Sequence, residues 1–256
     1  MKRILTSLVL IPLITWVVLW APTWIFLAVL AIVALLCFFE YSGIIEGHGI
    51  DRPGPMGYAA GLVILGAPAG QTAAITLLGL AALTMALTGR EMSRGLARAA
   101  ALMLGAIYIF GSWRCAGDLR AIDPYWLCFG LALNWVGDIA AYYVGRSFGR
   151  HKLAPRVSPA KTWEGAAASV CATLGFAAVY FPYLLPHVPL VKALPLAAAA
   201  NIAGQVGDLC ESALKRGAGI KDSGTLLPGH GGWLDRVDSS LFAVPVTYAL
   251  VKLLAV

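Results

Sequence analysis

Long apolar runs recur from one end of this 256-residue chain to the other, and they constrain its fold more than any other feature. The runs lie at 4–19, 24–39, 57–69, 72–88, 99–112, 125–144, 165–185, 194–206 and 241–256. A helix that crosses a bilayer needs about 17–25 residues, so the shorter runs are expected to be tilted pairs, re-entrant segments or helices extended by polar residues that face the protein interior. Backbone N–H and C=O groups inside a bilayer must form hydrogen bonds within the protein, and the runs lack the alternation of apolar and polar residues that is typical of a β-barrel. We therefore predict an all-α polytopic integral membrane protein with about nine transmembrane helices.

The charge content argues against other classes of protein. Hydrophobic residues make up 59% of the chain and charged residues 12%, whereas a soluble domain has about 25% charged residues. Disorder would need low hydrophobicity. The net charge of +6 does not indicate nucleic acid binding, because the basic residues lie between apolar runs, where membrane topology places them. The apolar pattern resumes after Pro22, so residues 4–19 are predicted to be a span and not a cleaved signal peptide.

The distribution of basic residues predicts the orientation. With the N-terminus in the cytoplasm, fifteen of the 19 Lys and Arg residues fall on the cytoplasmic side and four on the other side. Those four are Arg114, Arg120, Lys192 and Lys252. Positive residues gather in cytoplasmic loops. We therefore expect a multi-pass protein of the cytoplasmic membrane with a cytoplasmic N-terminus.

The chain divides by chemistry into two regions. Residues 1–124 are apolar with short loops, and residues 125–256 hold nearly all the unusual polar residues. We predict N-terminal membrane helices over 1–124 and a catalytic membrane region over 125–256. Its cytoplasmic loops are predicted at 145–164 and 207–239.

Asp138 lies inside the apolar run 125–144. An ionisable side chain at the centre of a span costs about 2.5–3.5 kcal/mol on insertion scales, and it usually marks a site. A structural carboxylate paired with an arginine is the alternative. The functional interpretation is favoured.

The loop 145–164 is rich in basic residues. Contact with anionic lipid explains its charge. It does not explain the stiffening prolines or the hydroxyl groups of Ser158 and Thr162 beside Lys161. Such a segment can bind phosphate oxygens, so these three residues are predicted to bind substrate.

The loop 207–239 carries carboxylates at both of its ends. One helical face carries Asp208, Glu211, Ser212 and Lys215, by their three- and four-residue spacing. Asp235 and Asp238 are three apart at the start of the last span. Two helix ends could thus direct carboxylates at one point, which suits Mg²⁺, an ion that completes its shell with water and phosphates.

Basic residues and glycines stand between these carboxylates. Lys215, Arg216, Lys221 and Arg236 can neutralise phosphate charge. The turn 229–232 is Gly-His-Gly-Gly, whose backbone N–H groups can approach an anion closely. A flexible loop with solvated charges is the alternative, and it leaves the dense interleaving of acids, bases and glycines unexplained.

The stretch from Ser212 to Asp238 resembles the sequence pattern of the phosphatidate cytidylyltransferase (CDP-diacylglycerol synthase) family. The matching positions are Ser212, Leu214, Lys215, Arg216, Lys221, Asp222, Gly224, Leu227, Pro228, His230, Gly231, Gly232, Trp233, Asp235, Arg236, Val237 and Asp238. Residues 158–165, Gly137-Asp138 and Ala141-Tyr142 also resemble the family, although the family usually has Lys where this chain has Ala160. The resemblance covers about residues 134–245.

The resemblance implies a reaction of CTP with phosphatidic acid that gives CDP-diacylglycerol and pyrophosphate, with Mg²⁺ held by Asp208 and Asp235. It also implies K⁺ as a second cation and a homodimer. Asp138 and Asp238 are further candidates for the metal. The predicted catalytic residues are Lys215, Arg216, Lys221, Asp222, His230 and Arg236. The predicted substrate-binding residues are Ser158, Lys161, Thr162, Ser212, Gly231 and Gly232.

Other functions remain open from the sequence. A CTP-dependent enzyme that acts on an isoprenoid phosphate would share the carboxylates. A membrane transporter of an anionic substrate would also place carboxylates in spans, although no repeated halves are evident. A structural membrane scaffold explains the apolar content but not the polar loops.

Overall fold

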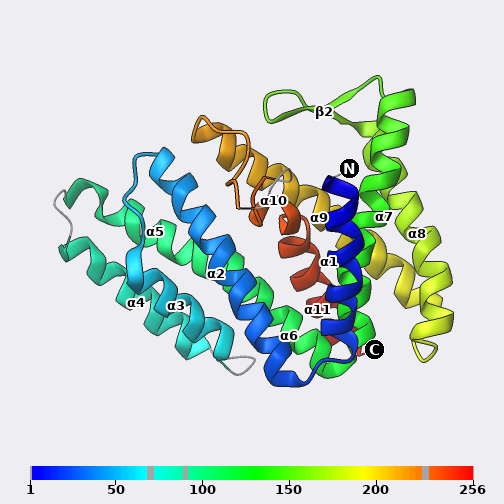
Figure 1. Ribbon diagram of the computed structural model, residues 1–256, viewed down its shortest axis with the longest axis horizontal. Coiled ribbons are helices and arrows are strands. Elements are labelled where there is room, and N and C mark those ends of the chain that lie inside the picture. The colour runs from blue at the N-terminus through cyan, green and yellow to red at the C-terminus, as the bar shows by residue number, and fades with distance from the viewer. Residues whose placement is uncertain (1, 68–71, 89–91, 227–230, 256) are drawn as a thin grey trace. The chain divides into compact units, whose positions relative to one another are not determined.

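The structure, a computed structural model, describes the backbone of residues 2–67, 72–88, 92–226 and 231–255. Helices form nearly all of it (Figure 1). The α-helices are α1 Lys2–Leu19, α2 Thr23–Gly47, α3 Gly54–Gly66, α4 Thr72–Thr88, α5 Gly95–Gly105, α6 Ser112–Ile122, α7 Pro124–Phe148, α8 Trp163–Leu184, α9 Leu190–Gly217, α10 Leu234–Val237 and α11 Ser240–Leu254. A 3₁₀ turn, η1 Met92–Arg94, precedes α5, and a π-helical turn, η2 Ala106–Gly111, joins α5 to α6.

The described residues confirm a helical polytopic membrane protein. Six helical segments are long and apolar enough to cross a bilayer: Thr23–Gly47, Gly95–Ile122, Pro124–Phe148, Trp163–Leu184, Leu190–Gly217 and Leu234–Leu254. Shorter apolar helices cover Gly54–Gly66 and Ile75–Thr84. The short runs predicted at 99–112 and 194–206 belong to two 28-residue helical segments. The polar residues Arg98, Ser112, Glu211 and Lys215 of these segments are buried. The total of nine spans stays a prediction.

Large apolar side chains point away from the protein interior along these helices. Trp24 is 71% exposed, Leu77 65% and Val191 79%. In water, so much exposed apolar surface would favour aggregation. In a bilayer it is surface that contacts lipid.

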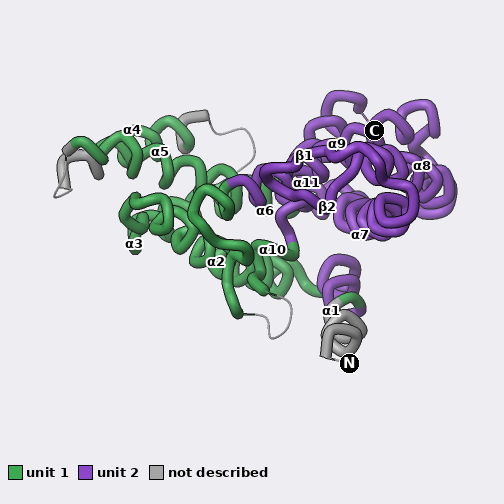
Figure 2. The backbone as a smooth tube through the Cα atoms, turned by 90° about the horizontal axis from the view of Figure 1, so that it is seen from above, with its two compact units in different colours: residues 1–11, 21–117, 214–236 green, residues 12–20, 118–213, 237–256 purple. Residues whose placement is uncertain are grey.

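The chain forms two compact units that interleave in sequence (Figure 2). Unit 1 contains Met1–Ile11, Ala21–Gly117 and Leu214–Arg236. Unit 2 contains Pro12–Trp20, Asp118–Ala213 and Val237–Val256. The division predicted at residue 124 separates N-terminal membrane helices from a catalytic region. The two compact units do not test which residues are catalytic, so this division stays a prediction.

Aromatic side chains and glycines form the core of unit 1. The rings of Phe38 and Phe110 have centroids 5.4 Å apart, and the Tyr41 hydroxyl donates to the Ala101 carbonyl at 2.9 Å. At glycine positions, the absence of a Cβ lets aromatic side chains of neighbouring helices pack directly against the helix backbone. A Cβ added at Gly61 would overlap the Phe110 ring, and one at Gly105 would lie 2.8 Å from Cδ1 of Tyr41.

The core of unit 2 combines aromatic packing with a polar network. The Phe129 and Phe181 rings, on α7 and α8, have centroids 4.8 Å apart. The amide of Asn201, on α9, donates to Ser169 Oγ at 3.0 Å and Thr173 Oγ1 at 2.9 Å. Hydrogen bonds of this kind connect helices in membranes, where apolar surface alone gives little specificity.

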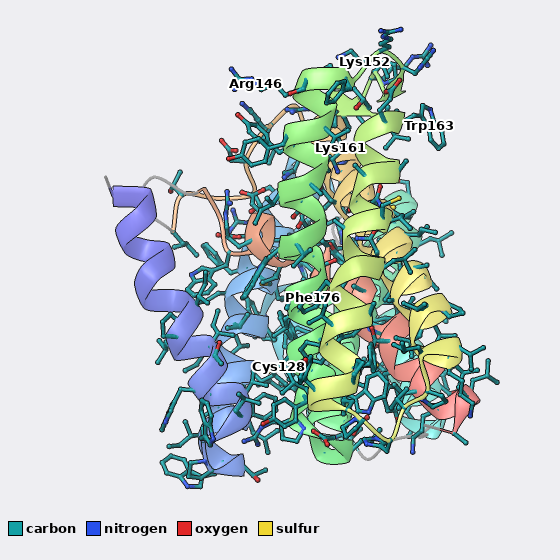
Figure 3. The ribbon with its side chains drawn as sticks, turned by 90° about the vertical axis from the view of Figure 1, so that its right-hand side faces the viewer. Cys128, Arg146, Lys152, Lys161, Trp163 and Phe176 are labelled. Carbon is teal, nitrogen blue, oxygen red and sulfur yellow. The ribbon has the colours of Figure 1, made fainter. Side chains whose placement is uncertain are left out.

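An antiparallel hairpin connects α7 to α8. Its strands are β1 Lys152–Ala154 and β2 Ser158–Thr162, with Lys152 opposite Thr162 and Ala154 opposite Ser158. In Figure 3, α7 and α8 lie side by side, and the labelled Arg146, Lys152, Lys161 and Trp163 gather at the hairpin end of the pair. Of the loop predicted at 145–164, residues 145–148 belong to α7 and residues 163–164 to α8, with the hairpin between them. Its cytoplasmic position stays a prediction.

We predict that Gly105→Ala destabilises the protein by about 1–3 kcal/mol, the usual cost of overpacking a core. The new methyl group would lie 2.8 Å from Tyr41 Cδ1 and 2.9 Å from Phe38 Cε2. Gly43→Ala is the matched control, because nothing lies within 4 Å of a Cβ there. Thermal unfolding of the purified protein in detergent compares the two variants. Equal melting temperatures would show that the packing around Gly105 is looser than described.

Candidate active site

Asp208 is the centre of a charged cluster in unit 2. It lies on α9 and forms an ion pair with Lys161, which reaches it from β2. The Ser212 hydroxyl, one turn further along α9, donates to Asp208 Oδ1 at 3.3 Å. The side chains of Lys161 and Asp208 are 28% and 27% exposed, so a ligand can reach the pair. The structure thus brings together three of the residues predicted from sequence.

Two further predicted carboxylates belong to the same unit. Asp138, on α7, interacts electrostatically with Asp208 and Lys161. The backbone carbonyl of Asp238 lies against Gly207, where an added Cβ would be 2.9 Å from it. The Asp238 side chain accepts a hydrogen bond from the Ser239 amide at 2.7 Å. These contacts place the start of α11 beside the part of α9 that carries Asp208.

The hairpin is anchored by local hydrogen bonds. Thr162 Oγ1 accepts from the Gly165 amide at 3.2 Å and caps α8. Glu164 accepts from the ring nitrogen Nδ1 of His151 at 2.6 Å. A substrate contact by Thr162 stays a prediction, since the structure gives its hydroxyl a capping role.

Neighbouring positions of β2 differ in what they face. Side chains alternate between the two faces of a strand. Lys161 points toward α9, whereas Ala160 is exposed. The departure from the family pattern at Ala160 therefore lies off the Lys161–Asp208 pair. Ser158 is half-buried in β2 opposite Ala154, and its role stays a prediction.

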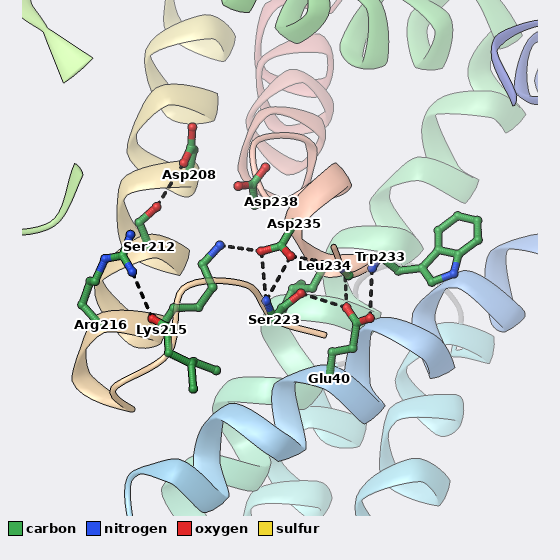
Figure 4. A network of polar contacts seen from close by, with 12 residues as sticks. Glu40, Asp208, Ser212, Lys215, Arg216, Ser223, Trp233, Leu234, Asp235 and Asp238 are labelled. Carbon is green, nitrogen blue, oxygen red and sulfur yellow. Dashed lines mark hydrogen bonds and ion pairs between the residues drawn. The ribbon is translucent and has the colours of Figure 1, made fainter. Parts of the chain in front are cut away.

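Asp235 is the centre of a second cluster, in unit 1 (Figure 4). Lys215 Nζ lies 2.5 Å from Asp235 Oδ1, and their side chains are only 9% and 8% exposed. Asp235 Oδ2 also accepts from the Ser223 amide at 3.0 Å and from the Gly232 amide at 2.9 Å. Gly231 has a φ of +80°, which favours glycine. The N–H group of Gly232 thus points at the protein's own Asp235, and the predicted approach of the glycine turn to a phosphate stays a prediction.

The remaining predicted residues of unit 1 line its exposed surface. Arg216, Lys221, Asp222 and Arg236 are exposed. Arg216 Nη1 donates to the Ile220 carbonyl at 3.1 Å, which holds the chain after α9. His230 lies outside the described residues. The catalytic roles of these residues stay predictions.

Sequence reasoning missed Glu40, a carboxylate on α2 that is 2% exposed. It accepts hydrogen bonds from the backbone of Trp233 and Leu234, in the same loop as Asp235. The signal was available, because Glu40 directly follows the apolar run 24–39 and the cost of a charge in a span applies to it as it does to Asp138.

The donor atoms fit Mg²⁺. Within the described residues, no group of three or more His, Cys, Asp or Glu side chains is arranged to hold a metal. Mg²⁺ needs only one or two carboxylates, because water and substrate phosphates complete its shell. Asp208 and Asp138 supply such oxygen atoms in unit 2, and Asp235 supplies them in unit 1. A cation shared by Asp208 and Asp235 stays a prediction.

Fold and clusters together define an integral membrane protein with two lysine–carboxylate clusters. Residues 1–254 match the model of the cytidylyltransferase family, and the chain belongs to this family. This confirms the resemblance found in the sequence.

Curated relatives resemble about half of the chain. A phosphatidate cytidylyltransferase of Bacillus subtilis is 40% identical over 155 residues, 59% of this chain and 58% of that protein. One of Thermotoga maritima is 44% identical over 132 residues, 48% of each chain. An uncharacterized protein of Escherichia coli, YnbB, is 45% identical over 124 residues, 48% of this chain and 41% of that protein. The chain thus spans less than two thirds of the length of these relatives.

We predict that Lys215→Met destabilises the protein by about 3–5 kcal/mol, because removal of one partner leaves a buried charge uncompensated. Lys152→Met, at an exposed position of β1, should change stability by about 0.5 kcal/mol or less. Thermal unfolding in detergent measures both. In the double variant Lys215→Met/Asp235→Asn the losses should be less than additive, and simple additivity would contradict a direct pair.

Proposed function

We propose that this protein transfers the cytidylyl group of CTP to phosphatidic acid and gives CDP-diacylglycerol and pyrophosphate, a step of phospholipid biosynthesis. The observation that carries the proposal is the pair of lysine–carboxylate contacts, Lys161–Asp208 and Lys215–Asp235. Lys215 and Asp235 are positions of the family pattern, Lys161 lies in the block 158–165 that also resembles the family, and the resemblance implies a metal at Asp208. Family membership and relatives named phosphatidate cytidylyltransferase support the choice of substrates.

The chemistry demands little beyond positioning and charge. The phosphate of phosphatidic acid is already an anion, so no strong base is required. Its oxygen attacks the α-phosphorus of CTP in line, a new P–O bond forms, and the bond to the β-phosphate breaks to release pyrophosphate. The difficulty is to bring two polyanions together, and preorganised cations are the usual solution.

The basic residues of both clusters are suited to this task. Lys161 and Lys215 contact phosphate oxygens in this proposal, with Arg216, Lys221 and Arg236 at the exposed edge. Ser158, Thr162 and Ser212 supply hydroxyl groups, and Gly231 and Gly232 let the chain approach the substrate. Asp222 and His230 complete the proposed catalytic set.

Mg²⁺ at Asp208 and Asp235, with Asp138 and Asp238 as further candidates, would polarise the α-phosphate and neutralise the leaving pyrophosphate. K⁺ is proposed as a second cation. In the free protein Lys161 and Lys215 neutralise the same two carboxylates, which therefore remain compensated when no cation is bound.

The membrane setting follows from the two substrates. CTP is soluble in water, so we propose that the site faces the cytoplasm, on the side where the basic residues gather. The acyl chains of the lipid enter sideways between helices. Nine spans, a cytoplasmic N-terminus and a homodimer complete this proposal.

Asp208→Asn and Asp235→Asn should each lower the turnover of CTP with phosphatidic acid by about 100-fold or more, because each removes a carboxylate that would hold the Mg²⁺ proposed to neutralise the phosphate charge. Asp123→Asn is the control: Asp123 caps α7 by accepting from the Tyr125 amide at 2.9 Å, and asparagine caps equally well. Release of pyrophosphate from purified protein is the measurement. Near-normal turnover of both variants would overturn the metal assignment.

The lipid acceptor is tested in the same assay. Wild-type protein should release pyrophosphate with CTP, Mg²⁺ and phosphatidic acid. This release should stop when the metal is chelated. An isoprenoid phosphate offered in place of phosphatidic acid should give little product. Preference for the isoprenoid phosphate would reassign the substrate, and absence of pyrophosphate with either lipid would favour a transporter.

A further inference from the structure

Glu40 lies near the end of α2, almost 200 residues from the loop that it contacts. Its Oε1 accepts from the Trp233 amide at 3.0 Å, and its Oε2 accepts from the Leu234 amide at 2.8 Å. The Ser223 hydroxyl donates to the same Oε2 at 3.0 Å (Figure 4). All of these residues belong to unit 1. One buried carboxylate thus joins two segments of the loop.

The loop is shaped around this carboxylate. A Cβ added at Gly232 would lie 2.7 Å from Cδ of Glu40, and one at Gly224 would lie 2.6 Å from its Oε1. Real Cβ atoms essentially never come so close to other heavy atoms. Both glycines of the family pattern therefore leave space that Glu40 fills.

The contacts of Glu40 continue directly into those of Asp235. Leu234 precedes Asp235 in α10, so its bond to Glu40 fixes the backbone that carries Asp235. Ser223 connects the two acids, because its hydroxyl donates to Glu40 and its amide donates to Asp235 at 3.0 Å. Glu40 and Asp235 hold the same loop segments through different donors.

We propose that Glu40 is a positioning residue for cytidylyl transfer. It fixes the segments around Ser223 and Leu234 so that Asp235 and its partner Lys215 are held in a reactive arrangement. This inference rests on the proposed function. With 2% exposure Glu40 is closed to substrate, so it acts through Asp235 and not by contact with phosphate.

The chemistry of the contacts requires a carboxylate. An ionised carboxylate only accepts hydrogen bonds, and here two backbone N–H groups and one hydroxyl face it. Hydrogen bonds to a charged acceptor are about twice as strong as neutral ones. Glutamine has nearly the same shape, but its NH₂ group would face an N–H donor, and one amide would lose its acceptor.

The test compares Glu40→Gln with Glu46→Gln in the full-length protein in detergent. Glu46 is the matched control, since it lies on the same helix but forms an exposed ion pair with Arg52. Glu40→Gln should lower kcat by about 10- to 100-fold, the cost of misplacing a catalytic group from a distance. The KM values for CTP and phosphatidic acid should stay within about 3-fold, since Glu40 contacts neither substrate. Glu46→Gln should match the wild type.

Hydrogen exchange supplies a readout that does not depend on activity. In Glu40→Gln the amides of Trp233 and Leu234 should exchange faster, while the rest of unit 1 keeps the protection of the wild type. The proposal is overturned if Glu40→Gln leaves both kcat and the exchange of these two amides at their wild-type values. It is also overturned by faster exchange throughout unit 1 with an unchanged kcat per folded molecule, because that is the result of a purely structural role.

Ser223→Ala covers the case in which Glu40→Gln does not fold. It removes only the hydroxyl contact with Glu40 and keeps the amide that bonds to Asp235. We expect kcat to fall by about 3- to 10-fold, the effect of losing one hydrogen bond, and the amides of Trp233 and Leu234 to exchange faster. If kcat and amide exchange both keep their wild-type values, the proposal is overturned. If the wild-type protein itself transfers no cytidylyl group, the proposed function fails, whereas the exchange data still decide whether Glu40 holds the loop.

Discussion

A charged side chain within a membrane-spanning fold is stable only where the protein supplies its partners, and the arrangement of this molecule follows from that requirement. Asp208 is paired with Lys161, and Asp235 with Lys215. Glu40 obtains its partners from two backbone amides and a hydroxyl. Each acid thus has at least one partner 20 or more positions away in sequence, and these contacts hold the loops in defined positions.

The same contacts suit the chemistry of the family. A cytidylyltransferase must accommodate several negative phosphates, and positive groups fixed before the substrate arrives need no reorganisation during the reaction. Lys161 and Lys215 are fixed by the carboxylates that they neutralise. Thr162, at the end of the hairpin that carries Lys161, accepts a hydrogen bond from the Gly165 amide of α8, and Asp235 accepts one from the Gly232 amide of its own loop.

Much of the candidate site was predictable because it depends on the spacing and composition of residues that are close in sequence. The spacing of Asp208 and Ser212 predicts a shared helical face, and the hydrogen bond between them agrees with it. The unusual density of acids, bases and glycines in 207–239 identifies the loop. Other features were not predictable. The hairpin at 152–162 is too short for a strand pattern, and the N–H group of Gly232 binds Asp235 where a phosphate was expected.

The sequence by itself determined that this chain is a helical membrane protein of the cytidylyltransferase family, because hydropathy and the Ser212–Asp238 pattern depend only on the order of residues. Only the tertiary structure decided which acid meets which base and that Glu40 belongs with the loop. These pairings join residues up to 194 positions apart. No periodicity along the chain records such contacts, since they depend on how helices pack and on where buried charges find donors.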